Sequence, residues 1–319
     1  MRQEAVPILA IVVPCYNEAI GLQHSIDKLL LHVESMAQRA VVSANSFVCC
    51  VDDGSRDKTW EVISAAVANG MKVTGVRLSS NCGHQVALYA GLVDVAGRCD
   101  IALSIDADLQ QDPGAIPRFV EAWRAGAEVV FGVRRDRASD SWLKRTTAAA
   151  YYKLMRIAGL DLLPNSADYR LVGAKALSAL SEHPEQSPYL RALFRQIGFQ
   201  TATVSFDVVK REFGTSKYTV RKMVKLAVSS VISYSTFPLK LITWVGASIS
   251  VTAFLMAVYA LVRTLIVGDT TPGWASTVLP IYMLGGVQLL FLGIIGEYVG
   301  QLVVEVKRRP RYIIEEKIG

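Results

Sequence analysis

Five short apolar runs, separated by stretches of helical periodicity, constrain the fold of this chain more than any other feature. They recur between residues 7 and 135, as Ile8–Val13, Phe47–Val51, Val73–Leu78, Ile101–Ile105 and Val129–Val133. Strands that alternate with helices form an open, mainly parallel sheet with helices on both faces. We therefore predict an α/β domain whose ligands bind at the carboxyl ends of the strands.

Polar clusters directly follow three of these runs. They are Asn17-Glu18, Asp52-Asp53 and Asp106-Ala107-Asp108. Because the carboxyl ends of parallel strands share one edge of a sheet, we expect the three clusters to converge on one crevice.

The Asp106-Ala107-Asp108 triplet predicts a divalent cation site. Side chains alternate along a strand, so both carboxylates face one side and Ala107 faces the other. Carboxylate oxygens suit Mg2+ or Mn2+, and substrate phosphates complete the coordination. Gln110 adds a neutral oxygen ligand in this interpretation. The alternatives are an ordinary acidic turn after a strand and a plain surface amide.

Two uncharged apolar stretches near the C-terminus, Leu241–Val262 and Thr277–Gly296, each have about the 20 residues that a helix needs to cross a bilayer. Each could instead be a buried core helix. Basic residues precede the first stretch and follow the second; they are Arg221, Lys222, Lys225, Lys240, Lys307, Arg308, Arg309 and Arg311. Arg263 lies at the outer end of the first stretch, and the connector Thr264–Ser276 has no Lys or Arg. Because Lys and Arg mark cytoplasmic loops, we predict a multi-pass protein of the bacterial inner membrane with both termini in the cytoplasm.

These patterns divide the 319 residues into four parts. A cytosolic α/β domain covers 1–215, an amphipathic juxtamembrane region 216–238, two membrane helices with a short external loop 239–304, and a basic cytosolic tail 305–319. The net charge of +6 fits attraction to anionic lipid. No nucleic-acid partner is expected, since the first 200 residues contain no basic run interleaved with aromatic residues.

Several motifs together resemble the family-2 glycosyltransferases, whose nucleotide-sugar domain is of the GT-A type. They are Val12-Val13-Pro14-Cys15-Tyr16-Asn17-Glu18, Val51-Asp52-Asp53-Gly54-Ser55, Asp106–Pro113, Asp168-Tyr169-Arg170-Leu171, Phe213–Tyr218, Ser233–Leu239 and Gly296–Gly300. The set covers essentially the whole chain. It is most similar to the polyprenyl-phosphate glycosyltransferases of the bactoprenol glucosyltransferase type, and it also resembles dolichol-phosphate mannose synthases.

The resemblance implies a donor pocket lined by residues that follow the first three strands. These residues are Pro14, Tyr16, Glu18, Asp53 and Asn81, with Asp53 at the uridine. Other roles stay open: Asp53 could cap a helix, Tyr16 could be a packing aromatic, and Glu18 could begin a helix. His84 is either a structural residue at a helix start or a donor to phosphate or sugar.

The resemblance also singles out Asp168 and a set of cations on the acceptor side. Asp168 is either a general base or a residue that orients the acceptor, because a phosphate monoester is already an anion at neutral pH. Residues that would bind phosphate are Arg134, Arg145, Arg211, Ser216 and Lys217. Arginine suits phosphate because its planar fork matches two oxygens.

The activity that the resemblance implies is the metal-dependent, inverting transfer of a hexose from a UDP-sugar to undecaprenyl phosphate. Glucose is the first candidate; N-acetylglucosamine, galactose and formylated aminoarabinose are alternatives. The product would serve cell-envelope or lipopolysaccharide O-antigen glycosylation. A different class of protein, a non-catalytic membrane scaffold or a flippase component, is the rival interpretation.

Small residues in the second apolar stretch would allow a homo-oligomer; they are Gly285, Gly286, Gly293 and Gly296.

Overall fold

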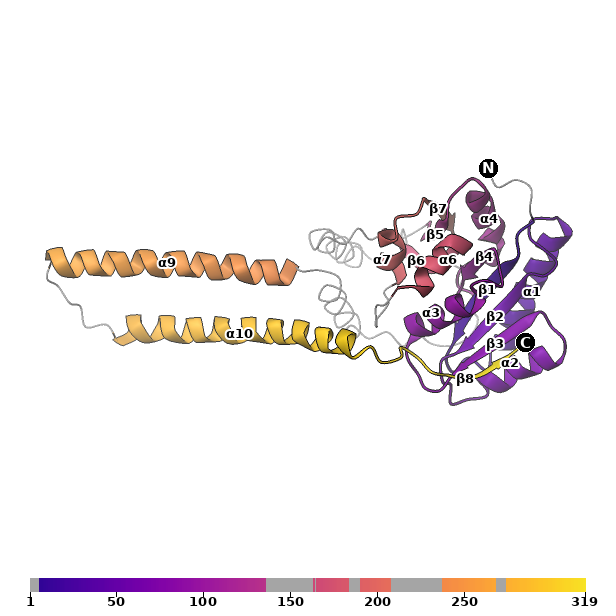
Figure 1. The fold of residues 1–319 in the computed structure, drawn as a ribbon, viewed down its shortest axis with the longest axis horizontal. Helices are drawn as coiled ribbons and strands as arrows, with labels where there is room; N and C mark the ends of the chain where they lie inside the picture. Colours follow the sequence, from indigo (N-terminus) through magenta and orange to yellow (C-terminus); the bar gives the residue numbers. More distant parts are fainter. Residues whose placement is uncertain (1–5, 136–162, 164, 184–189, 208–236, 268–273) are drawn as a thin grey trace. The chain divides into compact units, whose positions relative to one another are not determined.

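The computed structural model describes residues 6–135, 163, 165–183, 190–207, 237–267 and 274–319 (Figure 1). Eight strands form one sheet in the order β7-β5-β6-β4-β1-β2-β3-β8. Their bounds are β1 Leu9–Cys15, β2 Phe47–Asp52, β3 Val73–Leu78, β4 Ile101–Ser104, β5 Val129–Arg134, β6 Ser166–Gly173, β7 Thr201–Phe206 and β8 Ile314–Ile318. The five predicted runs correspond to β1 to β5.

The sheet is mixed, although the sequence predicts a mainly parallel one. β1 pairs in parallel with β2 and β4, β2 pairs in parallel with β3, and β5 pairs in parallel with β7. β6 lies antiparallel between β4 and β5, and β8 lies antiparallel beside β3. Six strands therefore share one direction, and β6 and β8 run against them.

Helices cover both faces of the sheet. The helical elements are α1 Leu22–Gln38, α2 Thr59–Ala68, α3 His84–Val95, the 3-10 turn η1 Pro113–Ala115, α4 Ile116–Arg124, α6 Ala174–Ser181, α7 Leu190–Gln196, α9 Phe237–Val267 and α10 Trp274–Lys307. Side chains of α1, α2 and α4 join the core on one face, and side chains of α3, α6 and α7 join the core on the other. The α/β architecture is thus confirmed.

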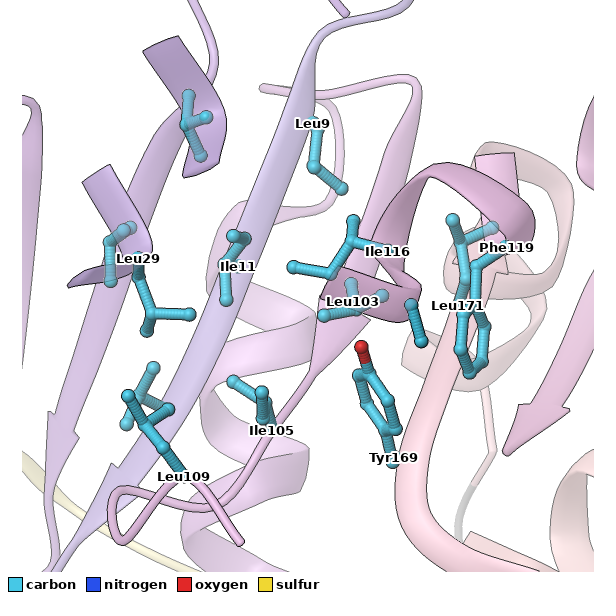
Figure 2. Close-up of a cluster of buried hydrophobic side chains, with 14 of the residues drawn as sticks. Leu9, Ile11, Leu29, Leu103, Ile105, Leu109, Ile116, Phe119, Tyr169 and Leu171 are labelled. Carbon is cyan, nitrogen blue, oxygen red and sulfur yellow. The ribbon is translucent and has the colours of Figure 1, made fainter. Parts of the chain in front are cut away.

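Burial of apolar side chains fixes the helix orientations. In α1 the buried apolar residues recur every three or four positions, which places them in one stripe; they are Leu22, Ile26, Leu29, Val33 and Met36. Figure 2 shows Leu29 of α1 and Phe119 of α4 on the core side of the sheet, near Ile11 and Leu103. Tyr169 of β6 packs in the same cluster against Phe119, with ring centroids 4.6 Å apart.

The last strand, β8, lies within the region that the sequence describes as a basic tail. Its backbone pairs with β3, with Gly75 opposite Ile318 and Arg77 opposite Glu316. A Cβ added to Gly75 would lie 2.8 Å from Ile318 Cγ1, so the strands approach closely because this residue has no side chain. Trp60 Nε1 of α2 also donates a hydrogen bond to Glu316 Oε2 over 3.0 Å.

The chain divides into two compact units, one with the sheet and one with α9 and α10. Within the second unit, α9 and α10 contact each other and run antiparallel (Figure 1). Among the described residues, one segment, Val287–Lys307 of α10, is apolar and long enough to cross a membrane. The two predicted spans are therefore not confirmed, and the predicted juxtamembrane region, 216–238, lies almost entirely outside the described residues.

Candidate active site

Asp106 and Asp168 meet at one edge of the sheet because β6 lies antiparallel beside β4. Ser104 is opposite Arg170 in the register of the two strands. Ser104 Oγ also donates a hydrogen bond to the carbonyl oxygen of Asp168 over 2.8 Å. Asp106 follows Ser104 by two residues and Asp168 precedes Arg170 by two, so β6 brings Asp168 to the edge where β4 ends.

Three side chains hold the carboxylate of Asp168. Arg170 Nη2 donates to Oδ1 over 2.6 Å, and Gln85 Nε2 donates to Oδ2 over 2.9 Å. Arg191 donates from both sides of its fork, with Nε 3.2 Å from Oδ1 and Nη2 3.1 Å from Oδ2. An ionised carboxylate offers about four acceptor positions, and these four donors occupy them.

The charges around Asp168 decide its protonation state. Burial alone would raise its pKa, but Arg191 and Arg170 outweigh burial and hold the pKa of this carboxyl well below its usual range. Asp168 is therefore a charged acceptor of hydrogen bonds at neutral pH. A strong proton acceptor needs the opposite shift.

His84 stands between the two carboxylates. Its Nε2 lies 3.6 Å from Asp106 Oδ1 and 3.7 Å from Asp168 Oδ2. Gly83 precedes α3 with φ of +93°, a conformation that favours glycine, and this turn aims His84 at the site. The sequence leaves two interpretations of His84 open, a structural residue at a helix start or a donor to phosphate or sugar. The geometry places its side chain beside Asp106 and Asp168.

Asp53 holds the turn that precedes α3 through two hydrogen bonds. Its Oδ1 accepts a hydrogen bond from the backbone N–H of Cys82 over 2.7 Å, and its Oδ2 accepts one from Gly83 over 3.0 Å. Only 2% of Asp53 is exposed. Its predicted contact with the nucleotide stays a prediction, and its observed role is to hold the loop that carries His84.

The loop after β4 orders Asp106 and Asp108. Gln111 contacts Asp106 twice, since its Oε1 accepts the Asp106 N–H over 3.2 Å and its Nε2 donates to Asp106 Oδ2. Asp108 Oδ1 accepts the Gln110 N–H over 3.2 Å. Burial raises the pKa of Asp106, and His84 opposes that shift. The predicted ligand Gln110 thus contacts Asp108 through its backbone, whereas Gln111, which lies in the Asp106–Pro113 motif but has no predicted role, contacts Asp106.

The donor set at this loop fits a hard divalent cation. Asp106 and Asp108 supply carboxylate oxygens, and 36% of the Asp106 side chain is exposed. Within the described part of the chain, no three His, Cys, Asp or Glu side chains gather closely enough to hold a metal ion by themselves. A cation here would need further ligands from a bound phosphate, as Mg2+ usually does.

The loops after β1 and β2 brace each other beside the site. Asn17 N–H donates to Ser55 Oγ over 2.9 Å, and Glu18 N–H donates to Thr59 Oγ1 over 3.0 Å. Tyr16 in this loop is 41% exposed. Of the other predicted donor residues, Pro14 is buried in β1 and Asn81 is exposed after β3. Their contacts with a nucleotide stay predictions.

The predicted phosphate ligands are described only in part. Arg134 is exposed at the end of β5, and its N–H donates to the carbonyl oxygen of Asn165 over 3.2 Å. The other four, Arg145, Arg211, Ser216 and Lys217, lie outside the described residues.

Sequence reasoning missed Arg191 and Gln85. Both contact Asp168 from helices, α7 and α3, that are distant from it along the chain. Neither lies in a distinctive motif, so the sequence offered no signal for them. Arg170 lies in the Asp168-Tyr169-Arg170-Leu171 motif, which predicts no role for it.

Comparison with known proteins agrees with this geometry. The family model described as "Glycosyl transferase family 2" matches residues 10–198. Over 313 residues the chain is 40% identical to the uncharacterized glycosyltransferase YkoT of Bacillus subtilis, covering 98% of this chain and 93% of that protein. It is 33% identical over 309 residues to the SfII prophage-derived bactoprenol glucosyl transferase of Shigella flexneri, covering 97% of each.

A solved structure is similar at a lower level. Glucosyl-3-phosphoglycerate synthase of Mycobacterium tuberculosis is 17% identical, with a TM-score of 0.48, over 71% of this chain and 78% of that one. A likeness this low carries no conclusion about ligands. The family match and the near full-length relatives do carry one: this chain is a glycosyltransferase with a GT-A domain, and it belongs to glycosyl transferase family 2.

Proposed function

We propose that this enzyme transfers a hexose, in the first instance glucose, from a UDP-sugar to undecaprenyl phosphate at the cytoplasmic face of the bacterial inner membrane. Relatives named bactoprenol glucosyl transferase support this acceptor, because their similarity extends over 97% of the chain and includes α9 and α10. A soluble acceptor would not require that the likeness continue beyond the sheet.

The observation that carries the chemistry is that Asp106 and Asp168 lie at the same edge of the sheet, because β6 pairs antiparallel with β4. Asp106 and Asp108 are the proposed ligands of Mg2+ or Mn2+, together with the diphosphate of the donor. A cation there neutralises the negative charge that develops on departing UDP. Gln111 would orient Asp106 for this task through its two hydrogen bonds.

The proposed acceptor needs no strong base. A phosphate monoester is ionised at neutral pH. One of its oxygens attacks the anomeric carbon, a carbon–oxygen bond forms there, and UDP leaves with the electron pair of the bond that breaks. Attack opposite to UDP inverts the centre, so an α-linked donor gives a β-linked product. Asp168, held as an anion, would orient the reacting groups rather than accept a proton.

The other predicted site residues are proposed to bind the donor, the metal or the acceptor phosphate. We propose that Asp53 acts on the donor through the Cys82–Gly83 backbone, which it holds. Exposed Arg134 is a proposed contact for the acceptor phosphate. The remaining proposed ligands are Pro14, Tyr16, Glu18 and Asn81 for the donor, Gln110 for the metal, and Arg145, Arg211, Ser216 and Lys217 for phosphate.

Strand pairing supports two membrane crossings. α9 and α10 lie between β7 and β8 in the chain, and both of these strands belong to one sheet. A single crossing would leave β7 and β8 on opposite sides of a membrane, so the number of crossings between them must be even. If Val287–Lys307 crosses once, a second segment must cross as well, and α9, with 31 residues, is the proposed one.

Mass analysis of lipid products tests the proposed reaction. Membranes containing the protein and undecaprenyl phosphate would be incubated with separate UDP-sugars: glucose, N-acetylglucosamine, galactose and formylated aminoarabinose. We expect a glucosyl-phosphate lipid that disappears on chelation of divalent metal and returns with Mg2+ or Mn2+. Another sugar in the product would correct the donor, and donor binding without any lipid product would favour a scaffold.

Thiol labelling tests the proposed topology. In Thr270→Cys, the new thiol lies in the predicted external loop and should react with an impermeant reagent in intact cells. The native thiol Cys82, beside the active site, should react only after the cells are opened. Labelling of Thr270→Cys only in opened cells would overturn the two-crossing proposal.

A further inference from the structure

We propose that Arg191 is a positioning residue for transfer: its fork fixes the Asp168 carboxylate and occupies the lone pairs that a general base would use. This inference deepens the proposed function and rests on it. It assigns a task to a residue in a short helix, α7, that no sequence motif marked.

The geometry of the pair is that of a bidentate fork. Arg191 Nε and Nη2 reach the two oxygens of Asp168 over 3.2 and 3.1 Å. Two parallel hydrogen bonds fix the plane of the carboxylate as well as its position, which a single ammonium group cannot do. Among the three side chains that hold Asp168, Arg191 is thus the one that contacts both carboxylate oxygens.

Of the two arginines that hold Asp168, Arg191 is the one that the sheet interior does not fix. Arg170 is fully buried two residues away on the same strand, so it is part of the sheet interior. The Arg191 side chain is 33% exposed and comes from another element. α7 stays anchored without it, because Leu190, Leu193 and Phe194 are all buried in the core.

His84 connects Asp168, which Arg191 positions, with Asp106 in the loop that is proposed to bind the metal. Nε2 of His84 lies 3.7 Å from Asp168 Oδ2 and 3.6 Å from Asp106 Oδ1. A carboxylate that rotates after loss of Arg191 would move Oδ2 of Asp168 away from this imidazole. The low pKa of Asp168, which Arg191 helps to set, agrees with an anchoring rather than a proton-accepting role.

A double-mutant cycle between Arg191 and Asp168 tests the inference. We would measure kcat and both KM values in wild type, Arg191→Ala, Asp168→Asn and the double variant. Loss of Arg191 should lower kcat about tenfold to a hundredfold, the effect of a small misplacement at a reacting centre. Both KM values should stay within about threefold, since the residue acts in positioning rather than binding. Added to Asp168→Asn, the second substitution should change kcat by less than about twofold, because its partner is already gone.

Two further variants make the result specific. Arg191→Lys keeps the charge but not the fork, so it should recover only part of kcat, and guanidinium added to Arg191→Ala should recover more. Arg195→Ala, one turn along α7, is the matched control and should behave as wild type. Its melting temperature and that of Arg191→Ala would show whether both fold.

If the loss of kcat in the double variant equals the product of the losses in the two single variants, the two residues act independently and the inference is overturned. A rise in KM for undecaprenyl phosphate at unchanged kcat would also overturn it, because it would make Arg191 an acceptor ligand. If wild type transfers sugar to a different acceptor, the proposed function is corrected, and the same cycle is decided on that acceptor instead.

Discussion

Replacing Asp168 with Asn should destabilise the sheet domain strongly, in addition to lowering activity. The carboxylate accepts four hydrogen bonds, three of them from arginine nitrogens. Only 11% of the Asp168 side chain is exposed, and Arg170 beside it is fully buried. The substitution removes the negative charge and leaves Arg170 without its neutralising partner.

The magnitude follows from this burial. Breaking a buried ion pair from one side costs about 3–5 kcal/mol, because the other charge remains desolvated. For a domain of this size about 1 kcal/mol corresponds to roughly 2–4 °C in melting temperature. We therefore expect the melting temperature of Asp168→Asn to fall by roughly 6–20 °C.

Asp207→Asn is a matched control, since it makes the same chemical change in an exposed pair. Asp207 lies 3.5 Å from Arg135, and the two side chains are 65% and 55% exposed. Exposed pairs contribute about 0–1 kcal/mol, so its melting temperature should fall by at most about 4 °C. Thermal unfolding in detergent, followed by far-ultraviolet circular dichroism, measures both variants. Equal shifts in the two would refute the view that Asp168 is a buried, charged anchor.

The pH dependence gives the same prediction a second test. The pKa of Asp168 is lowered from its ordinary value of 3.8. A carboxyl of this kind contributes its full stabilisation above that ordinary value and loses it as pH falls toward the folded-state pKa. The difference in melting temperature between wild type and Asp168→Asn should therefore be constant between about pH 5 and 8. A difference that shrinks within that window would place the pKa of Asp168 higher than its partners imply.

Other substitutions separate chemistry, packing and acceptor binding. Asp106→Asn or Asp108→Asn should abolish transfer at nearly unchanged melting temperature, whereas full activity of either in excess chelator would exclude a metal role. Gly132→Ala places a Cβ 2.6 Å from the Tyr169 carbonyl oxygen, so denaturant unfolding should show a loss of about 1–3 kcal/mol. Arg145→Ala should raise KM for polyprenyl phosphate more than KM for the sugar nucleotide, and equal rises would contradict an acceptor role.

Hydrophobic patterning predicts the strands that are continuous apolar runs, and it misses β6 and β8, which contain charged residues. β1 to β4 are apolar runs whose residues are almost all buried, so their sequences mark them clearly. β8 has the sequence Ile-Glu-Glu-Lys-Ile at the sheet edge, and its three charged residues read as a solvated tail. β6 contains Asp168 and Arg170, whose charges are explained only by the folded structure, in which Asp168 accepts hydrogen bonds from Gln85 of α3, Arg191 of α7 and Arg170 itself.

The site was predictable where a residue lies at a strand end and unpredictable where contacts cross the chain. Asp106 follows an apolar run, and the structure places it just beyond the end of β4 with 36% of its side chain exposed, while its role as a metal ligand stays a prediction. Gln85 and Arg191 reach Asp168 across 83 and 23 positions. No local periodicity encodes such distances, because α3 and α7 are placed by their apolar faces and the polar contacts follow from that packing.

The acidic residues at the ends of β2 and β4 differ in exposure and in hydrogen-bond partners, and these differences separate their roles. Asp52 is fully buried and its Oδ1 accepts the Ser55 N–H over 3.0 Å, while the oxygens of Asp53 are engaged with the Cys82–Gly83 backbone. Asp106 keeps 36% of its side chain exposed at the same edge. Burial raises the pKa of Asp106, and a bound divalent cation is the partner that would hold this carboxyl ionised. These differences support the proposal that the loop after β4 binds the metal and the diphosphate and that the loop after β2 supports it.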